Sequence, residues 1–187
     1  IDLPLQHASD PVLKRMKRPG TRRGYDALLG RIRARVPGVA LRTTFITGFP
    51  GETDADVDQL CEFVGDHAFE HVGVFTYSHE EGTSAHAFDD DVPPTAKAAR
   101  RHRVMSLQKR MVRRRQRARV GDRVRVLIDG ADPHELVLKG RLATQAPDID
   151  ASVYLTECDP SDYRPGDFAQ VEIVGARDYD LIGRPML

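Results

Sequence analysis

Residues 45–53, which read FITGFPGET, combine residue types that can form one wall of a ligand site. A run of strand formers ends at Gly48, and Gly51 follows just before an acid and a threonine. Two glycines let the backbone approach a ligand closely, and the N-terminus of a following helix offers free N–H groups to a polar or anionic group. An ordinary tight turn explains the same residues, with Thr53 as helix N-cap and Asp56 completing a capping box. Composition alone favours this second explanation.

Polar side chains follow two other predicted strands. Gln6 and His7 end the first strand, and Glu80, Glu81 and Thr83 follow the third. The amide of Gln6 can hydrogen-bond a ribose or another amide, whereas a lone histidine is more often a structural residue than a catalyst. The two acids and the hydroxyl could contact a polar substrate, although a solvated loop is the simpler explanation.

A cation stands among the apolar residues of the predicted second strand. Arg42 lies in the segment VALRTTFITG, where an unpaired buried charge would be costly. Its position therefore predicts an anionic partner, either a ligand carboxylate or a neighbouring glutamate.

The composition is that of a soluble chain. Charged residues make up 30% of the sequence, and no apolar run approaches the roughly 20 residues of a membrane helix. The opening residues IDLPLQHASD contain no signal peptide, and they begin inside a strand-like run without a methionine, so we expect a fragment of a longer protein. Cys61 and Cys158 have no metal-ligand spacing, which predicts no metal site in this chain and indicates a reducing, cytoplasmic setting.

Strand and helix patterns alternate over residues 1–78. Asp10 is placed as the N-cap of a first helix, and Thr21 as that of a second. The order strand, two helices, strand, helix, strand predicts an α/β fold with a parallel sheet and the helices outside. Three strands cannot close a barrel of the usual size, so the segment is about half of an α/β barrel or part of an open sheet. In both arrangements the site lies at the carboxyl ends of the strands.

Charge divides the rest of the chain into blocks. Residues 79–94 hold five acids and no Lys or Arg, whereas residues 95–119 hold eleven Lys or Arg and no acid. The basic block is predicted to be one long helix with an apolar stripe at Val104, Leu107 and Met111. Such a helix could bind nucleic acid, or it could be a solvated connector balanced by the acidic linker; the sequence favours neither.

Residues 120–187 carry short strand patterns separated by Gly, Pro and Asp turns, which predict a small antiparallel, OB-like β-barrel. With thirteen acids and seven bases, this block would repel a phosphate backbone and suits a basic protein partner. The predicted domains are therefore 1–94, a connector helix over 95–119, and a barrel over 120–187.

Three segments resemble the second half of the radical S-adenosylmethionine domain of methylthiotransferases: IDLPLQHASDPVLKRMKRPG, LRTTFITGFPGET and VFTYSHEEGTSA. A fourth, GRLATQAPDIDASVYL, resembles the terminal TRAM barrel of that family. Within the family, APDID and EEGTSA are most similar to the enzymes that methylthiolate an aspartate of a small-subunit ribosomal protein. The related tRNA enzymes usually carry a more basic TRAM sequence.

This resemblance implies S-adenosyl-L-methionine and two [4Fe–4S] clusters as cofactors. The cluster ligands lie outside this chain, because no CxxxCxxC motif occurs in it, and we expect the chain to be inactive alone. The resemblance places five residues at S-adenosylmethionine. Gln6 would face its polar part, Arg42 its carboxylate, and Phe45, Ile46 and Gly48 its adenine side.

The resemblance also implies a partner, a basic small-subunit ribosomal protein bound through the acidic TRAM domain. Candidate substrate contacts are Glu80, Glu81, Thr83, Asp148 and Asp150, and no catalytic residue is identified. RNA could bind through the basic helix. Two alternatives stay open at this point, a tRNA methylthiotransferase and a non-enzymatic RNA-binding adaptor.

Overall fold

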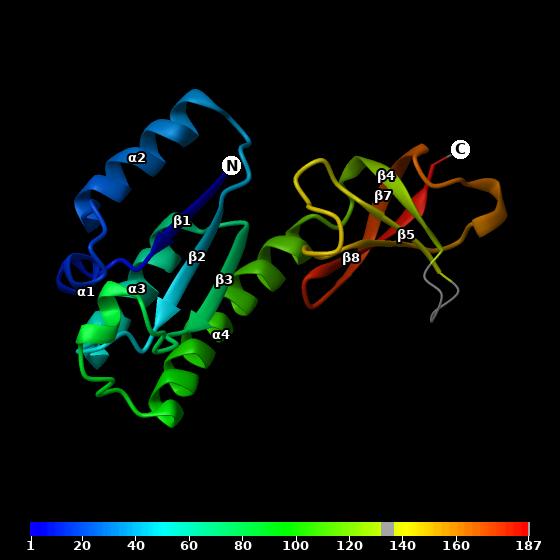
Figure 1. Ribbon diagram of the computed structural model, residues 1–187. Coiled ribbons are helices and arrows are strands. Elements are labelled where there is room, and N and C mark those ends of the chain that lie inside the picture. The colour runs from blue at the N-terminus through cyan, green and yellow to red at the C-terminus, as the bar shows by residue number, and fades with distance from the viewer. Residues whose placement is uncertain (132–136, 187) are drawn as a thin grey trace. The chain divides into compact units, whose positions relative to one another are not determined.

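The computed structural model describes residues 1–131 and 137–186 (Figure 1). Internal contacts divide the chain into two units, Ile1–Gln108 and Lys109–Leu187. The division falls inside the long helix α4 (Pro94–Ala118). Each unit is described by itself below.

The N-terminal unit contains a three-stranded parallel sheet in the order β1-β2-β3. The predicted α/β alternation is confirmed, with a short 3-10 helix η1 following the third strand. The elements before α4 are β1 (Asp2–Gln6), α1 (Asp10–Arg15), α2 (Arg22–Arg35), β2 (Arg42–Thr47), α3 (Asp54–His67), β3 (His71–Thr76) and η1 (Ser84–Ala87).

The core of this unit lies on one face of the sheet, against α3 (Figure 1). Side chains alternate along β2, so Phe45 is fully buried while Thr44 and Ile46 point to the opposite face. The ring of Phe45 packs edge-on against Phe63 and Phe69, with centroids 6.2 Å away in each case. Thr44 and Ile46, on the opposite face, are only half-buried.

Local capping starts α3 where the sequence predicts. The Thr53 hydroxyl accepts a hydrogen bond from Asp56 N at 3.3 Å, and the Asp56 carboxylate accepts one from Thr53 N at 2.8 Å. The prediction for α1 is wrong by one residue, because Ser9 is the N-cap and Asp10 is already helical. The carboxylate of Asp10 instead accepts a hydrogen bond from Arg22 N at 2.6 Å, which satisfies a free donor at the start of α2.

The helix α4 spans the basic block, but its buried stripe differs from the predicted one. Val104 is buried as expected, whereas Leu107 and Met111 are only half-buried. Gln108 is buried, and its side-chain amide donates to the Phe69 carbonyl at 3.1 Å. Across the described residues, no helix is both long and apolar enough to cross a bilayer. The buried positions of α4 are Lys97, Val104, Gln108 and Val112.

The C-terminal unit is a closed barrel with the strand order β4-β5-β6-β8-β7. The barrel prediction is confirmed, with one difference: β6 and β8 pair in parallel, whereas the other pairs are antiparallel. This parallel pair arises because the second strand of the β7–β8 hairpin closes the barrel against β6. The interior is apolar, with Val126, Val153 and Val171 fully buried. The strands are β4 (Arg123–Ala131), β5 (Leu138–Arg141), β6 (Val153–Leu155), β7 (Phe168–Arg177) and β8 (Asp180–Pro185), with a 3-10 helix η2 (Pro160–Asp162) before β7.

Candidate functional site

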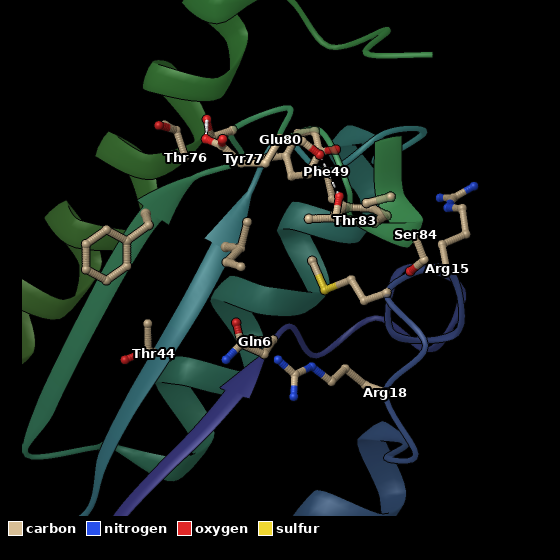
Figure 2. Close-up of a pocket in the computed structure, with 15 residues that line it drawn as sticks. Gln6, Arg15, Arg18, Thr44, Phe49, Thr76, Tyr77, Glu80, Thr83 and Ser84 are labelled. Atoms are coloured by element: carbon tan, nitrogen blue, oxygen red, sulfur yellow. Dashed lines mark hydrogen bonds between the residues drawn. The ribbon is translucent and has the colours of Figure 1, made fainter. Parts of the chain in front are cut away.

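A cavity of about 510 Å³ opens at the carboxyl ends of the three parallel strands (Figure 2). Each strand contributes to it, through Gln6 at the end of β1, Ile46 near the end of β2 and Thr76 at the end of β3. The loop after β3 adds Glu80 and Thr83. The size is within the usual range for a small-molecule site of about 300–1,000 Å³.

Gln6 reaches the cavity from an unusual backbone conformation. Its φ is +71°, and His7 N donates to the Leu5 carbonyl at 2.9 Å, which makes Gln6 the central residue of a γ-turn. This form of turn is rare and strained for a residue with a side chain. The pairing of β1 with β2 also shifts between Leu3 and Gln6. Strain of this kind, held at a cavity wall, is typical of ligand sites.

The strain at Gln6 gives a prediction about two substitutions. Gln6→Gly should leave the N-terminal unit about 1 kcal/mol more stable than Gln6→Ala, because only glycine adopts positive φ without a steric penalty. Hydrogen exchange of β1 amides would measure the difference. Both variants should weaken ligand binding equally, since both lose the amide; equal stability of the two variants would contradict strain at this position.

Two arginines that were not predicted from the sequence line the same cavity. The Arg18 side chain points toward Gln6 (Figure 2). Arg15 donates from Nη2 to the Gly51 carbonyl at 2.5 Å, and its Nε is buried without a hydrogen-bond partner among the described residues. A Cβ on Gly51, whose φ is +72°, would lie 2.7 Å from Arg15 Nη1. Gly51, the second glycine of the turn, therefore leaves the space that the Arg15 side chain occupies, and a larger residue would not.

Behind the cavity, one buried carboxylate connects the loops that follow β1 and β2. Glu52 Oε1 accepts hydrogen bonds from Gly48 N at 2.8 Å and from Arg100 of α4 at 3.0 Å. Its other oxygen lies 3.2 Å from His7 Nε2, and both of these side chains are fully buried. A Cβ on Gly48 would lie 2.2 Å from the Lys97 side chain. The first glycine of the turn thus lets α4 pack closely against it.

An aromatic cluster forms the upper rim of the cavity. The rings of Phe49 and Tyr77 pack edge-on with centroids 5.0 Å apart, and Phe49 also contacts Phe88. Burial raises the pKa of Tyr77, and the nearby carboxylates of Asp90 and Glu80 raise it further. The Tyr77 hydroxyl lies 3.2 Å from His79 Nδ1, so a second aromatic side chain holds it at this rim.

The cavity brings together four of the residues predicted from the sequence: Gln6, Ile46, Glu80 and Thr83. Phe45 is turned away from it into the core by strand alternation. Arg42 begins β2 at the opposite end of the strand, 3.8 Å from Asp2. These placements argue against side-chain contacts of Phe45 and Arg42 with a ligand in this cavity.

The remaining predicted residues lie elsewhere. Gly48 packs against α4, and Glu81 is exposed after β3 and does not line the cavity. Asp148 and Asp150 belong to the C-terminal unit, in the loop between β5 and β6, where Asp150 accepts a hydrogen bond from Ala146 N at 2.7 Å. Their role in substrate binding stays a prediction.

Within the described residues, no cluster of three His, Cys, Asp or Glu side chains is placed to hold a metal ion. Both cysteines lie outside the cavity lining. The cavity itself is lined by apolar side chains, by Arg15, whose Nε is buried, and by the side-chain amide of Gln6. A mostly apolar lining with a few polar groups is typical of small-molecule sites, and the guanidinium groups could bind a carboxylate.

Residues 120–186 match the family model of the TRAM domain. Over most of its length the chain is also similar to proteins called ribosomal protein uS12 methylthiotransferase RimO. It is 48% identical over 185 residues to that of Anaeromyxobacter sp. (strain K), covering 98% of this chain and 39% of the relative. The corresponding values are 44% over 184 residues for Solibacter usitatus and 42% over 183 for Acetivibrio thermocellus, each covering 98% of this chain and 40% of the relative.

The chain thus spans about two fifths of the length of the curated relatives that it matches. These matches confirm the resemblance to methylthiotransferases that the motifs predict, and they confirm the TRAM prediction for the barrel.

Proposed function

We propose that this chain is part of a radical S-adenosylmethionine methylthiotransferase that adds a methylthio group to the β carbon of an aspartate in a small-subunit ribosomal protein. The observation that carries the proposal is the 48% identity to a ribosomal protein uS12 methylthiotransferase over 98% of the chain. The cavity at the strand ends supports it, because its lining suits the proposed cofactor.

The proposed fit to S-adenosylmethionine uses residues from all three strand ends. Arg18 and the partnerless Nε of Arg15 would bind the carboxylate, since guanidinium groups form strong charge-assisted hydrogen bonds with it. Gln6 would bind a polar group of the cofactor. Ile46 and Phe75, whose side chain is 63% exposed at the cavity, would cover the adenine.

In this proposal two [4Fe–4S] clusters supply the electron for cofactor cleavage and take part in sulfur insertion, and cysteines outside this chain hold them. The residues of this chain would bind and orient the cofactor and exclude water from one side. The chain alone would then bind little iron and show no activity. Near-stoichiometric iron in the purified chain would contradict this assignment.

The proposed protein substrate is basic, and acidic side chains occur in both units. Residues 120–187 hold thirteen acids and seven bases, and Asp148 and Asp150 lie in a loop of this unit. Glu80 and Thr83 line the cavity, with Glu81 beside them in the sequence. These acids would bind basic side chains of the ribosomal protein near the reacting aspartate.

Mass spectrometry of ribosomal proteins from cells with and without the complete gene would test the function. We expect one small-subunit protein to lose the mass of a single methylthio group when the gene is deleted. The complete gene should restore that mass, and a gene lacking the codons for 120–187 should not. Unchanged ribosomal protein masses would contradict the proposal.

A tRNA methylthiotransferase is the second candidate, because the basic helix α4 suits a nucleic-acid substrate. Analysis of tRNA nucleosides from the same two strains distinguishes the candidates. Loss of a methylthiolated nucleoside, with ribosomal proteins unchanged, would favour this candidate. A non-enzymatic adaptor predicts that both analyses stay unchanged and that the complete protein binds no iron.

A further inference from the structure

The helices α1 and α2 of the N-terminal unit carry a concentration of positive charge that the proposed function uses only in part. Residues 10–36, which read DPVLKRMKRPGTRRGYDALLGRIRARV, contain nine Lys or Arg and two acids. Both acids are already bound within the chain. Asp10 accepts a hydrogen bond from Arg22 N at 2.6 Å, and Asp26 lies 2.7 Å from His67 Nε2. Most of the positive charge in this segment is therefore uncompensated.

The arginines on the inner side of α2 stabilise the fold. Figure 1 shows α2 along the outer side of the N-terminal unit. Arg22 and Arg33 are half-buried and reach α3, where Arg22 pairs with Asp66 at 2.8 Å and Arg33 donates to the His67 carbonyl at 2.9 Å. These two side chains are occupied and offer little to a partner.

The arginines on the outer side of α2 have no such contacts. Arg23, Arg31 and Arg35 are exposed, and within residues 1–131 and 137–186 no ion pair holds them. At 3.6 residues per turn they share about a third of the helix circumference, away from the buried Leu29. Arg31 and Arg35 are four residues apart, where like charges destabilise a helix. An external anion would relieve this repulsion.

The same side of α2 is flat. The other positions on it carry at most a methyl group, and they are Gly24, Ala27, Gly30 and Ala34. A Cβ at Gly30 would meet no atom within 4 Å, so packing does not require a glycine there. Glycine inside a helix is destabilising relative to alanine. This side of α2 therefore gives up helix stability twice, in its charges and at Gly30, and both features suit the close approach of a large anionic surface.

More free cations lie at the end of α1, beside the cavity at the strand ends. Arg15 and Arg18 line that cavity (Figure 2). Lys14 and Lys17 belong to the same segment, are exposed, and have no ion pair among the described residues. We define the α1–α2 basic face as the exposed cations of these two helices outside the cavity, which are Lys14, Lys17, Arg23, Arg31 and Arg35.

We propose that the α1–α2 basic face binds the phosphate backbone of folded RNA, so that the enzyme recognises its ribosomal protein in the RNA-bound state. The proposal rests on the proposed function and specifies the state of its substrate. A basic ribosomal protein alone would be repelled by this face, whereas RNA bound to that protein would be attracted. Phosphate contacts fix position without reading sequence. RNA held beside the cavity would thus place the bound protein at the strand ends.

The chemistry of the face favours folded RNA over other anions. The outer side of α2 carries guanidinium groups, which suit phosphate, and over residues 22–35 it has no exposed aromatic ring on which a base of a single strand could stack. Double-stranded RNA is recognised mostly through its shape and backbone. From Arg23 to Arg35 the helix extends about 18 Å, a length over which a duplex presents several phosphates. A helix that lies in a membrane surface would instead expose large apolar side chains.

Activity of the complete, cluster-loaded protein on two forms of the substrate tests the proposal. One form is the isolated small-subunit ribosomal protein, and the other is the small ribosomal subunit from cells that lack the gene. The triple variant Arg23→Gln, Arg31→Gln, Arg35→Gln should lower kcat/KM for the subunit at least about tenfold and leave that for the isolated protein within about twofold. A merely structural role would lower both values alike.

The outcomes of this experiment separate the two proposals. An equal loss of kcat/KM on both forms in the triple variant, or wild-type activity on the isolated protein alone, would overturn the role of the basic face and leave the proposed function standing. Wild-type activity on neither form would contradict the proposed function itself.

Fluorescence anisotropy of the complete protein with a labelled RNA duplex of mixed sequence measures the contact directly. The Gln triple variant should lower the slope of log affinity against log salt by about 3, at roughly 0.9 per lost phosphate contact of a duplex. The matched control changes Arg23, Arg31 and Arg35 to Lys, which keeps the charge and should retain most of the affinity. Equal losses of duplex affinity in the Gln and Lys variants would overturn the proposal.

Two further arms test the anion and the surface. Poly-glutamate, and vesicles of phosphatidylcholine and phosphatidylserine in equal parts, should bind more weakly than the duplex, and tighter binding of either would overturn the assignment to RNA. Gly30→Glu places a carboxylate between the arginines although Glu is the better helix former. Hydrogen exchange of α2 should then be no faster than in the wild type, while duplex affinity should fall at least about threefold. Unchanged duplex affinity in this variant would overturn binding at this face.

Discussion

Glu52→Ala is expected to raise the exchange rate of the most protected β2 amides about a hundredfold. The substitution removes the carboxylate that lies 3.2 Å from His7 Nε2, and it removes one of the two carboxylates that bind Arg100. Breaking a buried pair by removing one partner costs about 3–5 kcal/mol, because the other charge or donor stays buried. A loss of about 3 kcal/mol corresponds to roughly a hundredfold.

Hydrogen exchange followed by peptide mass spectrometry measures this effect in β2 directly. A single unfolding curve would combine the unfolding of the two units of the chain. Glu62→Ala is the matched control, since Glu62 is an exposed glutamate on α3, the helix that follows Glu52. Glu52→Gln should give an intermediate effect, because the amide oxygen can still accept from Gly48 N. Similar exchange in the Glu52→Ala and Glu62→Ala variants would contradict the role of Glu52.

Removal of both cavity arginines is expected to weaken S-adenosylmethionine binding about a hundredfold. The double variant Arg15→Ala, Arg18→Ala removes two charge-assisted hydrogen bonds to the proposed carboxylate, each contributing about 1.5 kcal/mol. Isothermal titration calorimetry with the complete, cluster-loaded protein would measure this loss of affinity. Lysine at both positions should restore only part of the affinity, because an ammonium lacks the planar fork of guanidinium.

The controls for this experiment also show whether Arg42, or Arg15 together with Arg18, binds the carboxylate of the cofactor. Lys14→Ala combined with Arg23→Ala removes two exposed cations from the neighbouring helices and should leave the affinity unchanged. Arg42→Ala should also leave it unchanged, since Arg42 lies at the far end of β2. A large loss of affinity in Arg42→Ala, with none in the Arg15 and Arg18 double variant, would show that Arg42 binds the carboxylate.

Much of the fold could be predicted because its causes are local. Thr53 and Asp56 sit at the spacing that a capping box requires, and strand and helix patterns alternate along residues 1–78. The parallel pairing of β6 with β8 could not be predicted in this way. It depends on how the β7–β8 hairpin closes the barrel, which no single segment encodes.

A cavity lies at the strand ends, where the sequence predicts the site, and Gln6 and Ile46 line it. The binding roles of these residues stay a prediction. The family resemblance places Phe45 at the adenine, although strand alternation turns its side chain into the core. Arg15 and Arg18 were missed because their segment, KRMKR, reads as a solvated helix end. Only the tertiary contact of Arg15 with Gly51 reveals its position at the turn.

The division of the chain within α4 has a consequence for how the two units fold. Isolated helices shorter than about 12–15 residues are marginal in water, because nucleation is unfavourable. The N-terminal unit holds the first fifteen residues of α4, and the C-terminal unit holds only the last ten, from Lys109 to Ala118. Ten residues are too few for a stable isolated helix, so the last turns of α4 depend on contacts within the C-terminal unit, such as the hydrogen bond from the Gln116 side-chain amide to the Tyr179 carbonyl at 3.1 Å.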